Sequence, residues 1–412
     1  MSPPPSSKKD SKKASKEAPA QAPSRAEIRA GRFETRPTLS PVEAGEAPVF
    51  GLLAPDGAGL VSDPLAEAGL DPEGALRIYK SLRLVRAIDE RMMTLQRQGR
   101  VGFYGAHTGQ EAVPVAVAEA LYDRDWIFPA LREGPIMLHR GFDLATYLAQ
   151  IFGTSLDRLK GRNMPSHMAA REVNQVSWSS VIGPQITQAA GAAYAAKLKG
   201  DDVVAVGFMG DGATSSADFH TGLNFAAVWQ APALFICQNN HWSISVPTER
   251  QTAAPSIAQK ALAYGMPGLR VDGNDALALF KATQDAAARA RRGEGPTFIE
   301  CLTYRIGAHS SSDDPRVYRD EAEVEVWRER DPIARLRAFL IAQGHWSEAQ
   351  DEALIAALTQ EVAAAARQAE EAPPPTIDTL FTDVYAELPW HLEDQRREHA
   401  EARAAEGDKG AH

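Results

Sequence analysis

Cysteine is scarce in this sequence: Cys237 and Cys301 are the only two among 412 residues. Both lie in apolar, strand-like runs, so we expect core thiols rather than a disulfide or a metal site, which suits a reducing compartment. Positive charge is not in excess either, because 54 acidic residues outnumber 44 Lys and Arg and the formal net charge is −10. This balance argues against general nucleic-acid binding. No run approaches the roughly 18 apolar residues that span a bilayer.

The two ends of the chain are poor in apolar residues. The first 40 residues are rich in Pro, Ser, Ala and Lys, so we predict a disordered basic arm at 1–40, followed by an α/β domain at 41–375. The arm lacks the apolar segment of a secretory signal, and its Lys-rich composition, which includes acidic residues, differs from that of a mitochondrial presequence. We therefore expect a cytoplasmic protein rather than one of the mitochondrial matrix. A helical C-terminal tail is predicted at 376–412, with fraying over its highly charged end.

The stretch 203–245 is predicted to form the central strands of the domain. Its first apolar run, 203–209, is typical of a strand buried on both faces of a parallel sheet, and it ends in the sequence Gly-Asp-Gly around Asp211. A second apolar run, 233–237, leads into a pair of asparagines that ends at Asn240. Because the carboxyl ends of neighbouring parallel strands meet at one edge of a sheet, Asp211 and Asn240 should lie close together.

Such a pair suits a divalent cation that carries a diphosphate. Mg²⁺ prefers oxygen ligands and is usually held by one or two carboxylates together with phosphates. Asp211 would supply the carboxylate, Asn240 an amide oxygen, and the backbone carbonyl of Trp242 a third oxygen. Gly210 and Gly212 allow the backbone to approach the phosphates, and the N-terminus of the following helix favours their charge.

Two other interpretations of this stretch are weaker. A Gly-Asp-Gly sequence alone is more often a turn, but here it closes one apolar run and Asn-Asn closes the next, which resembles the thiamine diphosphate signature. A dinucleotide-binding fold needs G-x-G-x-x-G at the start of the helix and an acidic residue near the end of the second strand. Positions 210–215 read GDGATS and the second strand ends in amides, so an NADH-binding oxidoreductase is disfavoured.

Three side chains outside this stretch are candidates for function. His309 lies in a polar loop after a predicted strand at 296–305, where α/β enzymes place catalytic groups, and it is the only residue of that loop able to transfer protons near neutral pH. Arg132 follows a short strand, and on spacing alone it is interpreted as part of a surface ion pair. His167 lies in a Gly- and Pro-containing loop, and a lone loop histidine is more often structural than catalytic.

Several longer motifs together resemble the alpha subunits of the E1 component of 2-oxo acid dehydrogenase complexes, specifically the branched-chain enzymes. These motifs are QRQGRVGFY at 96–104, GRNMPSH at 161–167, QAAGAAYAA at 188–196, the GDG…NN unit, TYRIGAHSSSDDP at 303–315, DPIARLRAFLIAQGHW at 331–346 and LFTDVYAELP at 380–389. The resemblance extends over about 75–389. It implies a thiamine diphosphate-binding α/β fold, with a parallel sheet flanked by helices.

The resemblance also implies roles for individual residues. Thiamine diphosphate contacts are implied at Leu131, Arg132, Ser180, Ile182, Gly210, Asp211, Gly212, Ala213, Asn240 and His309. Mg²⁺ ligation is implied for Asp211, Asn240 and the Trp242 carbonyl. Catalytic roles are implied for His309, as a proton donor in reductive acylation of a lipoyl group, and for Ser180, beside the aminopyrimidine. Gln238 departs from the family, because this position can be a diphosphate-binding arginine.

Partners and substrate follow from the same resemblance. It implies an α2β2 heterotetramer with the cofactor between the subunits, a glutamate supplied by the E1 beta subunit, and transfer of the acyl group to the lipoyl arm of E2. The implied reaction is decarboxylation of a branched-chain 2-oxo acid such as 2-oxoisovalerate. Pyruvate and acetoin remain alternative substrates. A noncatalytic scaffold is a further alternative, against which the intact Asp211, Asn240 and His309 count.

Overall fold

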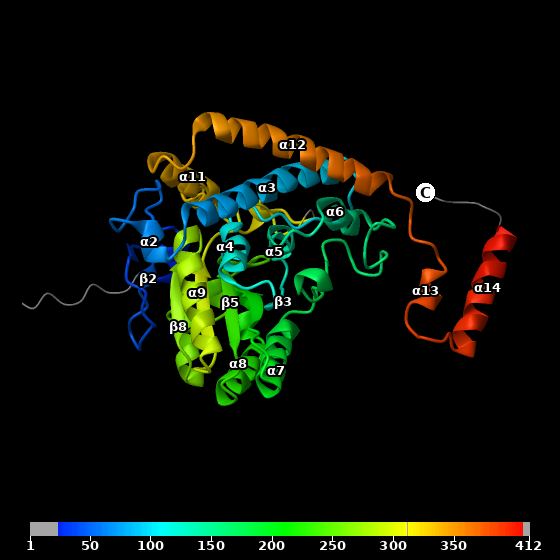
Figure 1. The fold of residues 1–412 in the computed structure, drawn as a ribbon, viewed down its shortest axis with the longest axis horizontal. Coiled ribbons are helices and arrows are strands. Elements are labelled where there is room, and N and C mark those ends of the chain that lie inside the picture. The colour runs from blue at the N-terminus through cyan, green and yellow to red at the C-terminus, as the bar shows by residue number, and fades with distance from the viewer. Residues whose placement is uncertain (1–23, 311, 407–412) are drawn as a thin grey trace, which may run out of the picture.

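The computed structural model describes residues 24–310 and 312–406, and its centre is a seven-stranded sheet (Figure 1). The strand order is β1-β2-β8-β9-β5-β4-β3, and every neighbouring pair is parallel. Its strands are β1 (Thr35–Arg36), β2 (Val49–Phe50), β3 (Trp126–Phe128), β4 (Ala205–Gly210), β5 (Ala233–Asn239), β8 (Gly268–Asp272) and β9 (Thr297–Leu302). A separate antiparallel pair consists of β6 (Trp242–Ser243) and β7 (Val246–Pro247).

The central strands are apolar throughout because both faces of the sheet are covered. In β4, Val206 and Phe208 belong to the core on one face, whereas Ala205 and Met209 belong to the core on the other. β4 pairs directly with β5, with Ala205 opposite Ala233. The predicted neighbouring parallel strands at 203–209 and 233–237 are therefore confirmed.

Fourteen α-helices accompany the strands within the described residues. They are α1 (Arg25–Arg29), α2 (Pro64–Ala68), α3 (Pro72–Arg97), α4 (Ala112–Ala120), α5 (Gly134–His139), α6 (Leu144–Phe152), α7 (Pro184–Lys199), α8 (Ala217–Val228), α9 (Ala276–Arg291), α10 (Glu321–Arg328), α11 (Pro332–Ala342), α12 (Glu348–Glu371), α13 (Thr379–Thr382) and α14 (Trp390–Glu406).

The helices form layers on the two faces of the sheet. On one face, α9 packs on the strands and contacts α4, α3 packs on α4, and α12 lies outermost across α3 and α6 (Figure 1). On the other face, α7 packs against β3, β4 and β5, and α8 packs against α7. This is the predicted α/β fold with a parallel sheet flanked by helices. Among the helices of the described ranges, none combines the length and apolar content needed to cross a bilayer.

Folded structure begins earlier than the boundary predicted at residue 41. Helix α1 places Ile28 in the core with 1% of its surface exposed, and Phe33 is buried beside it. The indole Nε1 of Trp327 donates a hydrogen bond to the Arg29 carbonyl at 2.7 Å. The composition of this segment is polar on average, but two apolar side chains are enough to fix it to the domain. Residues 1–23 of the predicted arm lie outside the described residues.

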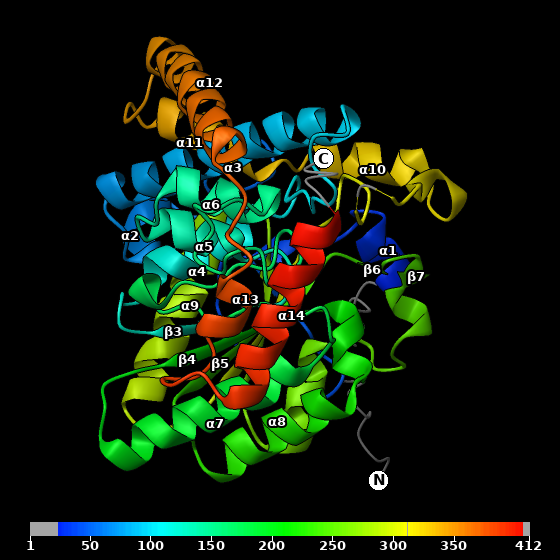
Figure 2. The same cartoon turned by 90° about the vertical axis from the view of Figure 1, so that its right-hand side faces the viewer.

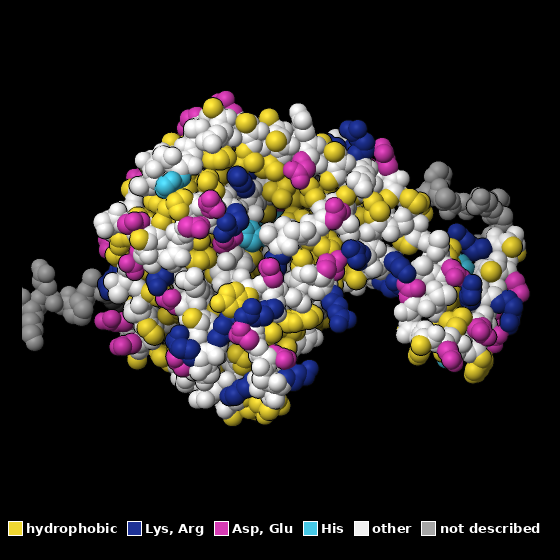
Figure 3. All heavy atoms as spheres, in the orientation of Figure 1, with side chains coloured by type: hydrophobic (Ala, Val, Ile, Leu, Met, Phe, Trp, Pro, Cys, Tyr) yellow, Lys and Arg dark blue, Asp and Glu magenta, His cyan; other side chains and the backbone are white. Residues whose placement is uncertain are grey.

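The C-terminal residues 376–406, called the C-terminal arm below, extend away from the body (Figures 1 and 3). Figure 2 shows the arm from the side on which α14 faces the viewer. Fraying was predicted over roughly the last twenty residues, but α14 continues to Glu406, and only 407–412 lie outside the description. Pairs such as Arg397–Asp394, three residues apart on the helix, provide local support for a helix with little packing.

Candidate functional site

Four adjacent strands deliver polar groups to one cavity at the carboxyl edge of the sheet. In the order β9-β5-β4-β3, the segments after these strands carry His309, Asn240, Asp211 and Arg132, respectively. The cavity has a volume of about 330 Å³. Its position agrees with the general location of ligand sites in open parallel sheets.

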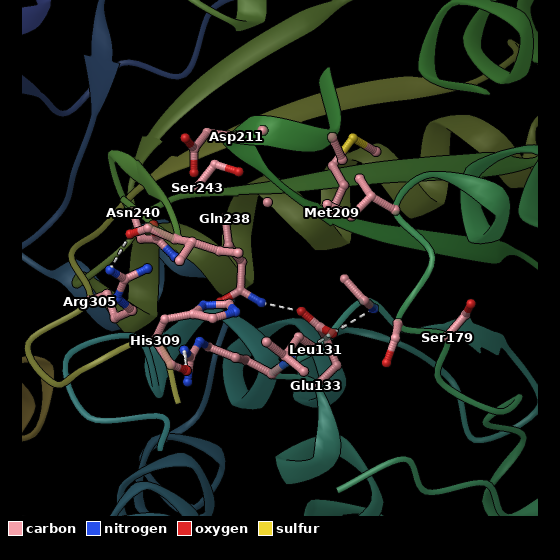
Figure 4. A pocket seen from close by; sticks show the side chains of 18 of the residues that line it. Leu131, Glu133, Ser179, Met209, Asp211, Gln238, Asn240, Ser243, Arg305 and His309 are labelled. Atoms are coloured by element: carbon pink, nitrogen blue, oxygen red, sulfur yellow. Dashed lines mark hydrogen bonds between the residues drawn. The ribbon is translucent and has the colours of Figure 1, made fainter. Parts of the chain in front are cut away.

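All of the residues predicted to form the site line this cavity. They are Leu131, Arg132, Ser180, Ile182, Gly210, Asp211, Gly212, Ala213, Asn240, Trp242 and His309. Figure 4 shows Asp211 and Asn240 along one side, Leu131 and Glu133 on the opposite side, and His309 with Arg305 between them. The fold therefore brings the predicted residues together, whereas their individual roles stay predictions.

Asp211 is a buried carboxylate that is oriented by a neighbouring hydroxyl. Thr248 Oγ1 donates a hydrogen bond to Asp211 Oδ2 at 3.0 Å. Burial raises the pKa of the Asp211 carboxyl to about 6, because the charged form loses its hydration there. A cation at this position would offset that cost, so the carboxylate is suited to a metal ligand.

The other two predicted metal ligands are held by the loop after β5. Asn240 Nδ2 donates to Gln110 Oε1 at 2.8 Å, and Asn240 Oδ1 accepts the backbone N–H of Trp242 at 3.1 Å. These bonds fix the orientation of the Asn240 amide group and so distinguish the position of its oxygen from that of its nitrogen. The Trp242 carbonyl accepts a hydrogen bond from Arg305 Nη1 at 3.3 Å. One carboxylate, one amide oxygen and one carbonyl match the ligands that Mg²⁺ prefers.

A cluster of three or more His, Cys, Asp and Glu side chains able to hold a metal does not occur within residues 24–310 and 312–406. The predicted set does not require such a cluster, because an amide and a backbone carbonyl supply two of its three oxygens. This composition argues for a hard cation that brings further ligands with it, such as phosphate oxygens, rather than for zinc.

Two arginines, Arg132 and Arg305, add positive charge to the cavity. Arg132 Nη2 donates to the His309 carbonyl at 2.9 Å, and Nη1 donates to the Ala106 carbonyl. Burial and the nearby Arg305 lower the pKa of Arg132 to about 10, so its guanidinium still carries charge at neutral pH. The interpretation of Arg132 as part of a surface ion pair is wrong, because only 5% of its surface is exposed.

His309 is neutral in this environment. Burial, together with the charges of Arg132 and Arg305, lowers the pKa of the imidazole to about 4. The backbone N–H of His309 donates to Asp313 Oδ2 at 2.7 Å, which holds the loop in place. At neutral pH the ring can accept a proton or a hydrogen bond, and an anionic ligand beside it would raise its pKa.

The two glycines that flank Asp211 at the end of β4 differ in their surroundings. A Cβ on Gly210 would meet no heavy atom within 4 Å, so the missing side chain leaves open space in the cavity. A Cβ on Gly212 would collide with the Ser243 side chain. Both glycines line the cavity, so their contact with a ligand stays a prediction, and Gly212 is in addition required for packing against β6.

The segment after Asp211 also differs from the prediction. A short 3-10 helix, η2 (Asp211–Ser215), comes first, and α8 begins only after Ser216, whose side chain caps it. The N-terminus of α8 is therefore displaced along the chain from Asp211. The positive charge available to phosphates in the cavity therefore comes from the two arginines rather than from a helix that starts at the Gly-Asp-Gly turn.

Several polar residues of the cavity were not predicted. Arg305 Nε and Gln110 Nε2 are buried donors without a hydrogen-bond partner among residues 24–310 and 312–406, and both residues line the cavity. Unpaired buried donors of this kind point to an acceptor-rich ligand. Arg305 lies within the motif at 303–315, but neither its spacing nor that of Gln110 reveals burial, so the sequence carried no usable signal.

Glu133 is a second carboxyl group of the cavity that was not predicted. Its Oε2 accepts the backbone N–H groups of Ala130 and Arg132 at 2.7 and 3.1 Å, and its Oε1 accepts Gln238 Nε2. Burial raises the pKa of Glu133 to about 7 despite these bonds. Gln238, where the family can have arginine, thus pairs with a neighbouring acid instead of adding positive charge.

Comparisons with known proteins identify the family of the chain. Residues 79–378 match the family model described as "Dehydrogenase E1 component". The chain is 41% identical over 342 residues to the 2-oxoisovalerate dehydrogenase subunit alpha, mitochondrial, of Homo sapiens, which covers 83% of this chain and 77% of that protein. It is 44% identical over 352 residues to the 3-methyl-2-oxobutanoate dehydrogenase subunit alpha of Mycobacterium tuberculosis, which covers 84% of this chain and 92% of that protein.

Proposed function

The chain belongs to the dehydrogenase E1 component family, and we propose that it is the alpha subunit of a branched-chain 2-oxo acid dehydrogenase E1 enzyme. The proposed reaction is the thiamine diphosphate-dependent oxidative decarboxylation of 2-oxo acids such as 2-oxoisovalerate, with transfer of the acyl group to a lipoyl group on E2. The observation that carries the proposal is the cavity in which Asp211, Asn240, Arg132 and His309 meet. We expect the protein to act in the cytoplasm.

The residues of the cavity fit a magnesium diphosphate. Asp211, Asn240 and the Trp242 carbonyl would hold Mg²⁺, and Arg132 and Arg305 would bind the diphosphate, with the unpaired Gln110 Nε2 as a further donor. Thiamine diphosphate, when bound, supplies the carbanion chemistry of decarboxylation. The chain contributes binding, orientation and a neutral imidazole at His309 that holds or passes a proton.

Exposed apolar side chains at the mouth of the cavity support the proposal of a second subunit. Met164, Val181, Ile182 and Ile244 line the cavity, yet each exposes at least 51% of its surface. Apolar side chains concentrated around a polar site are typical of a protein interface. We propose that the E1 beta subunit covers this mouth and excludes water from the reaction, as expected for an α2β2 heterotetramer.

The test is an assay of the chain co-purified with its beta subunit. Decarboxylation of 2-oxoisovalerate and of pyruvate is measured with an artificial electron acceptor, with and without thiamine diphosphate and Mg²⁺. We expect turnover only in the complete enzyme, and we expect it to be faster on 2-oxoisovalerate than on pyruvate. Asp211→Ala should abolish turnover, whereas the control Asp201→Ala, which removes an exposed carboxylate, should retain it.

Each other outcome has a defined meaning. Faster turnover of pyruvate would overturn the substrate and keep the site. Full activity of Asp211→Ala would overturn the metal assignment. The absence of turnover by a folded, cofactor-loaded tetramer would favour acetoin or a noncatalytic subunit.

A further inference from the structure

His167 lines the cavity, and the proposed function gives it no role. It lies in the segment 153–183 between α6 and α7, and only 6% of its surface is exposed. Its ring packs against Trp178, with 5.9 Å between the ring centroids. A histidine this deeply enclosed beside a ligand cavity is held in one orientation.

The backbone around His167 is held in a costly conformation. Ser166 has a φ of 65°, in the left-handed region that residues other than glycine seldom adopt. The Gln150 side chain on α6 accepts the His167 N–H at 3.1 Å and donates to the Met164 carbonyl at 2.8 Å. Asn163 Nδ2 donates to the His167 carbonyl at 3.0 Å. Strain that surrounding bonds maintain in this way is concentrated at functional sites.

The hydrogen bonds of the ring determine which nitrogen carries hydrogen. Nδ1 lies 3.1 Å from the Pro165 carbonyl, which can only accept, so Nδ1 is the donor. In the neutral ring Nε2 is then an acceptor, and it lies 2.5 Å from Ser180 Oγ. The Ser180 hydroxyl therefore donates to His167, and its lone pairs remain free on the cavity side.

We propose that His167 is a positioning residue for Ser180. By accepting the hydroxyl hydrogen, His167 turns the Ser180 lone pairs into the cavity, where they accept a hydrogen bond from an N–H group of the bound cofactor. The buried ring fixes the position of an exposed serine at the cavity mouth, and Pro165 fixes the tautomer of the ring. This inference rests on the proposed function, in which Ser180 contacts thiamine diphosphate.

A double-mutant cycle measures whether His167 acts through Ser180. The dissociation constant of thiamine diphosphate is determined by calorimetry, with Mg²⁺, for the α–β complex carrying Ser180→Ala, His167→Asn, or both. A neutral hydrogen bond predicts about two- to tenfold weaker binding for each single variant. We expect the double variant to bind no more weakly than Ser180→Ala, whereas multiplied losses would overturn the proposal.

His167→Gln is the matched rescue variant. Glutamine can place its Oε1 near the position of the imidazole Nε2, so it can still accept from Ser180, whereas asparagine is too short. Binding by His167→Gln should approach that of the wild type, and equal losses in the two variants would overturn the proposal.

A second experiment requires no cofactor. Diethyl pyrocarbonate modifies imidazole nitrogens that have a free lone pair, and the Ser180 hydroxyl occupies the lone pair of His167 Nε2. In the cofactor-free α–β complex, Ser180→Ala should accelerate modification of His167 several-fold, as measured by peptide mass mapping, while His309 keeps its rate and serves as internal reference. An unchanged rate at His167 would overturn the pairing.

The two experiments separate the inference from the proposed function. A wild-type complex that binds no thiamine diphosphate would overturn the proposed function and with it the cofactor contact of Ser180. The pairing of His167 with Ser180 would still be tested, because the modification rate does not depend on the cofactor. Normal cofactor binding with an unchanged modification rate would overturn the role of His167 alone.

Discussion

Two carboxyl groups face the cavity, and their surroundings differ at the scale of single residues. Asp211 accepts one side-chain hydroxyl and has room for a cation, whereas Glu133 accepts two backbone N–H groups and an amide. Burial raises the pKa of both groups. The first is suited to binding a metal, and the second to shaping the turn that carries Arg132.

The hydroxyl of Thr248 should matter for metal affinity. Thr248→Val keeps the shape of the side chain but removes the donor to Asp211 Oδ2. Loss of such an orienting bond typically weakens metal affinity by about 10- to 100-fold, and we expect a loss in this range. Titration of the α–β complex with Mg²⁺ in the presence of thiamine diphosphate measures it. Thr359→Val, on the exposed side of α12, is the control, and equal affinities for the two variants would contradict the prediction.

Glu133 should make stability depend on pH. Its pKa of about 7 in the folded chain lies above the ordinary value of 4.5, so its contribution to stability is full below pH 4.5 and is lost as the pH rises through 7. Glu133→Gln removes the titration, and the Gln238 amide can turn its unpaired Oε1 toward the new donor.

The free energy of unfolding of Glu133→Gln relative to wild type should therefore rise between pH 5 and pH 8, by at most about 3 kcal/mol. Urea denaturation at each pH measures this difference. Glu352→Gln, at an exposed position of α12, should give a constant difference. Parallel pH profiles for Glu133→Gln and wild type would show that this carboxyl does not titrate as described.

At the level of secondary-structure elements, the two glycines where β4 leads into η2 should affect different properties, one cofactor binding and the other stability. Gly210→Ala adds a methyl group to open cavity space, so it should leave stability unchanged and weaken cofactor binding. Gly212→Ala drives a methyl group into Ser243, and overpacking of this kind typically costs about 1–3 kcal/mol.

Thermal unfolding and cofactor titration of the two alanine variants measure these effects. Addition of Ser243→Gly to Gly212→Ala should restore most of the lost stability, because it removes the colliding atoms. The reverse pattern, with Gly210→Ala as the unstable variant, would show that the turn is built differently.

At the scale of the whole molecule, the domain extends beyond the α/β layers in both directions along the chain. Helix α1 is tied to α10 through Arg29 and Trp327, and the C-terminal arm is tied to the body near residue 160, where Lys160 and Arg162 pair with Asp383. Leu380, Val384, Tyr385 and Trp390 of the arm remain more than half exposed. The arm and the cavity mouth are therefore the two places described above where large apolar side chains remain exposed.

Two truncations test the N-terminal limit of the domain. Deletion of residues 1–40 removes the buried Ile28 and Phe33 and should lower the free energy of unfolding by at least about 3 kcal/mol. Deletion of residues 1–23 removes only the polar segment and should leave stability within about 0.5 kcal/mol of wild type. Denaturant unfolding of both proteins measures the difference, and equal stabilities would restore the boundary to residue 41.

Patterns in the amino-acid sequence predict the fold class, and together with the family resemblance they predict most of the residues that line the cavity. Apolar runs that end in Gly-Asp-Gly and Asn-Asn specify buried parallel strands, and parallel strands bring their carboxyl ends to one edge, so Asp211 and Asn240 were predictable together. His309 was predictable from its polar loop after a strand, whereas Arg132 was placed with them only by resemblance to a family. An apolar run and the polar residues that end it are adjacent in the chain, so they can be recognised from the sequence alone.

The burial of the polar side chains and the choice of their hydrogen-bond partners follow from the packing of the whole chain. Arg305, Gln110, Glu133 and the pairing of His167 with Ser180 depend on segments that are distant in sequence and packed around one cavity. Likewise, Ile28 belongs to the fold because Trp327 and its neighbours form a surface for it. Burial and charge environment are properties of the packed chain, so no motif or spacing could specify them.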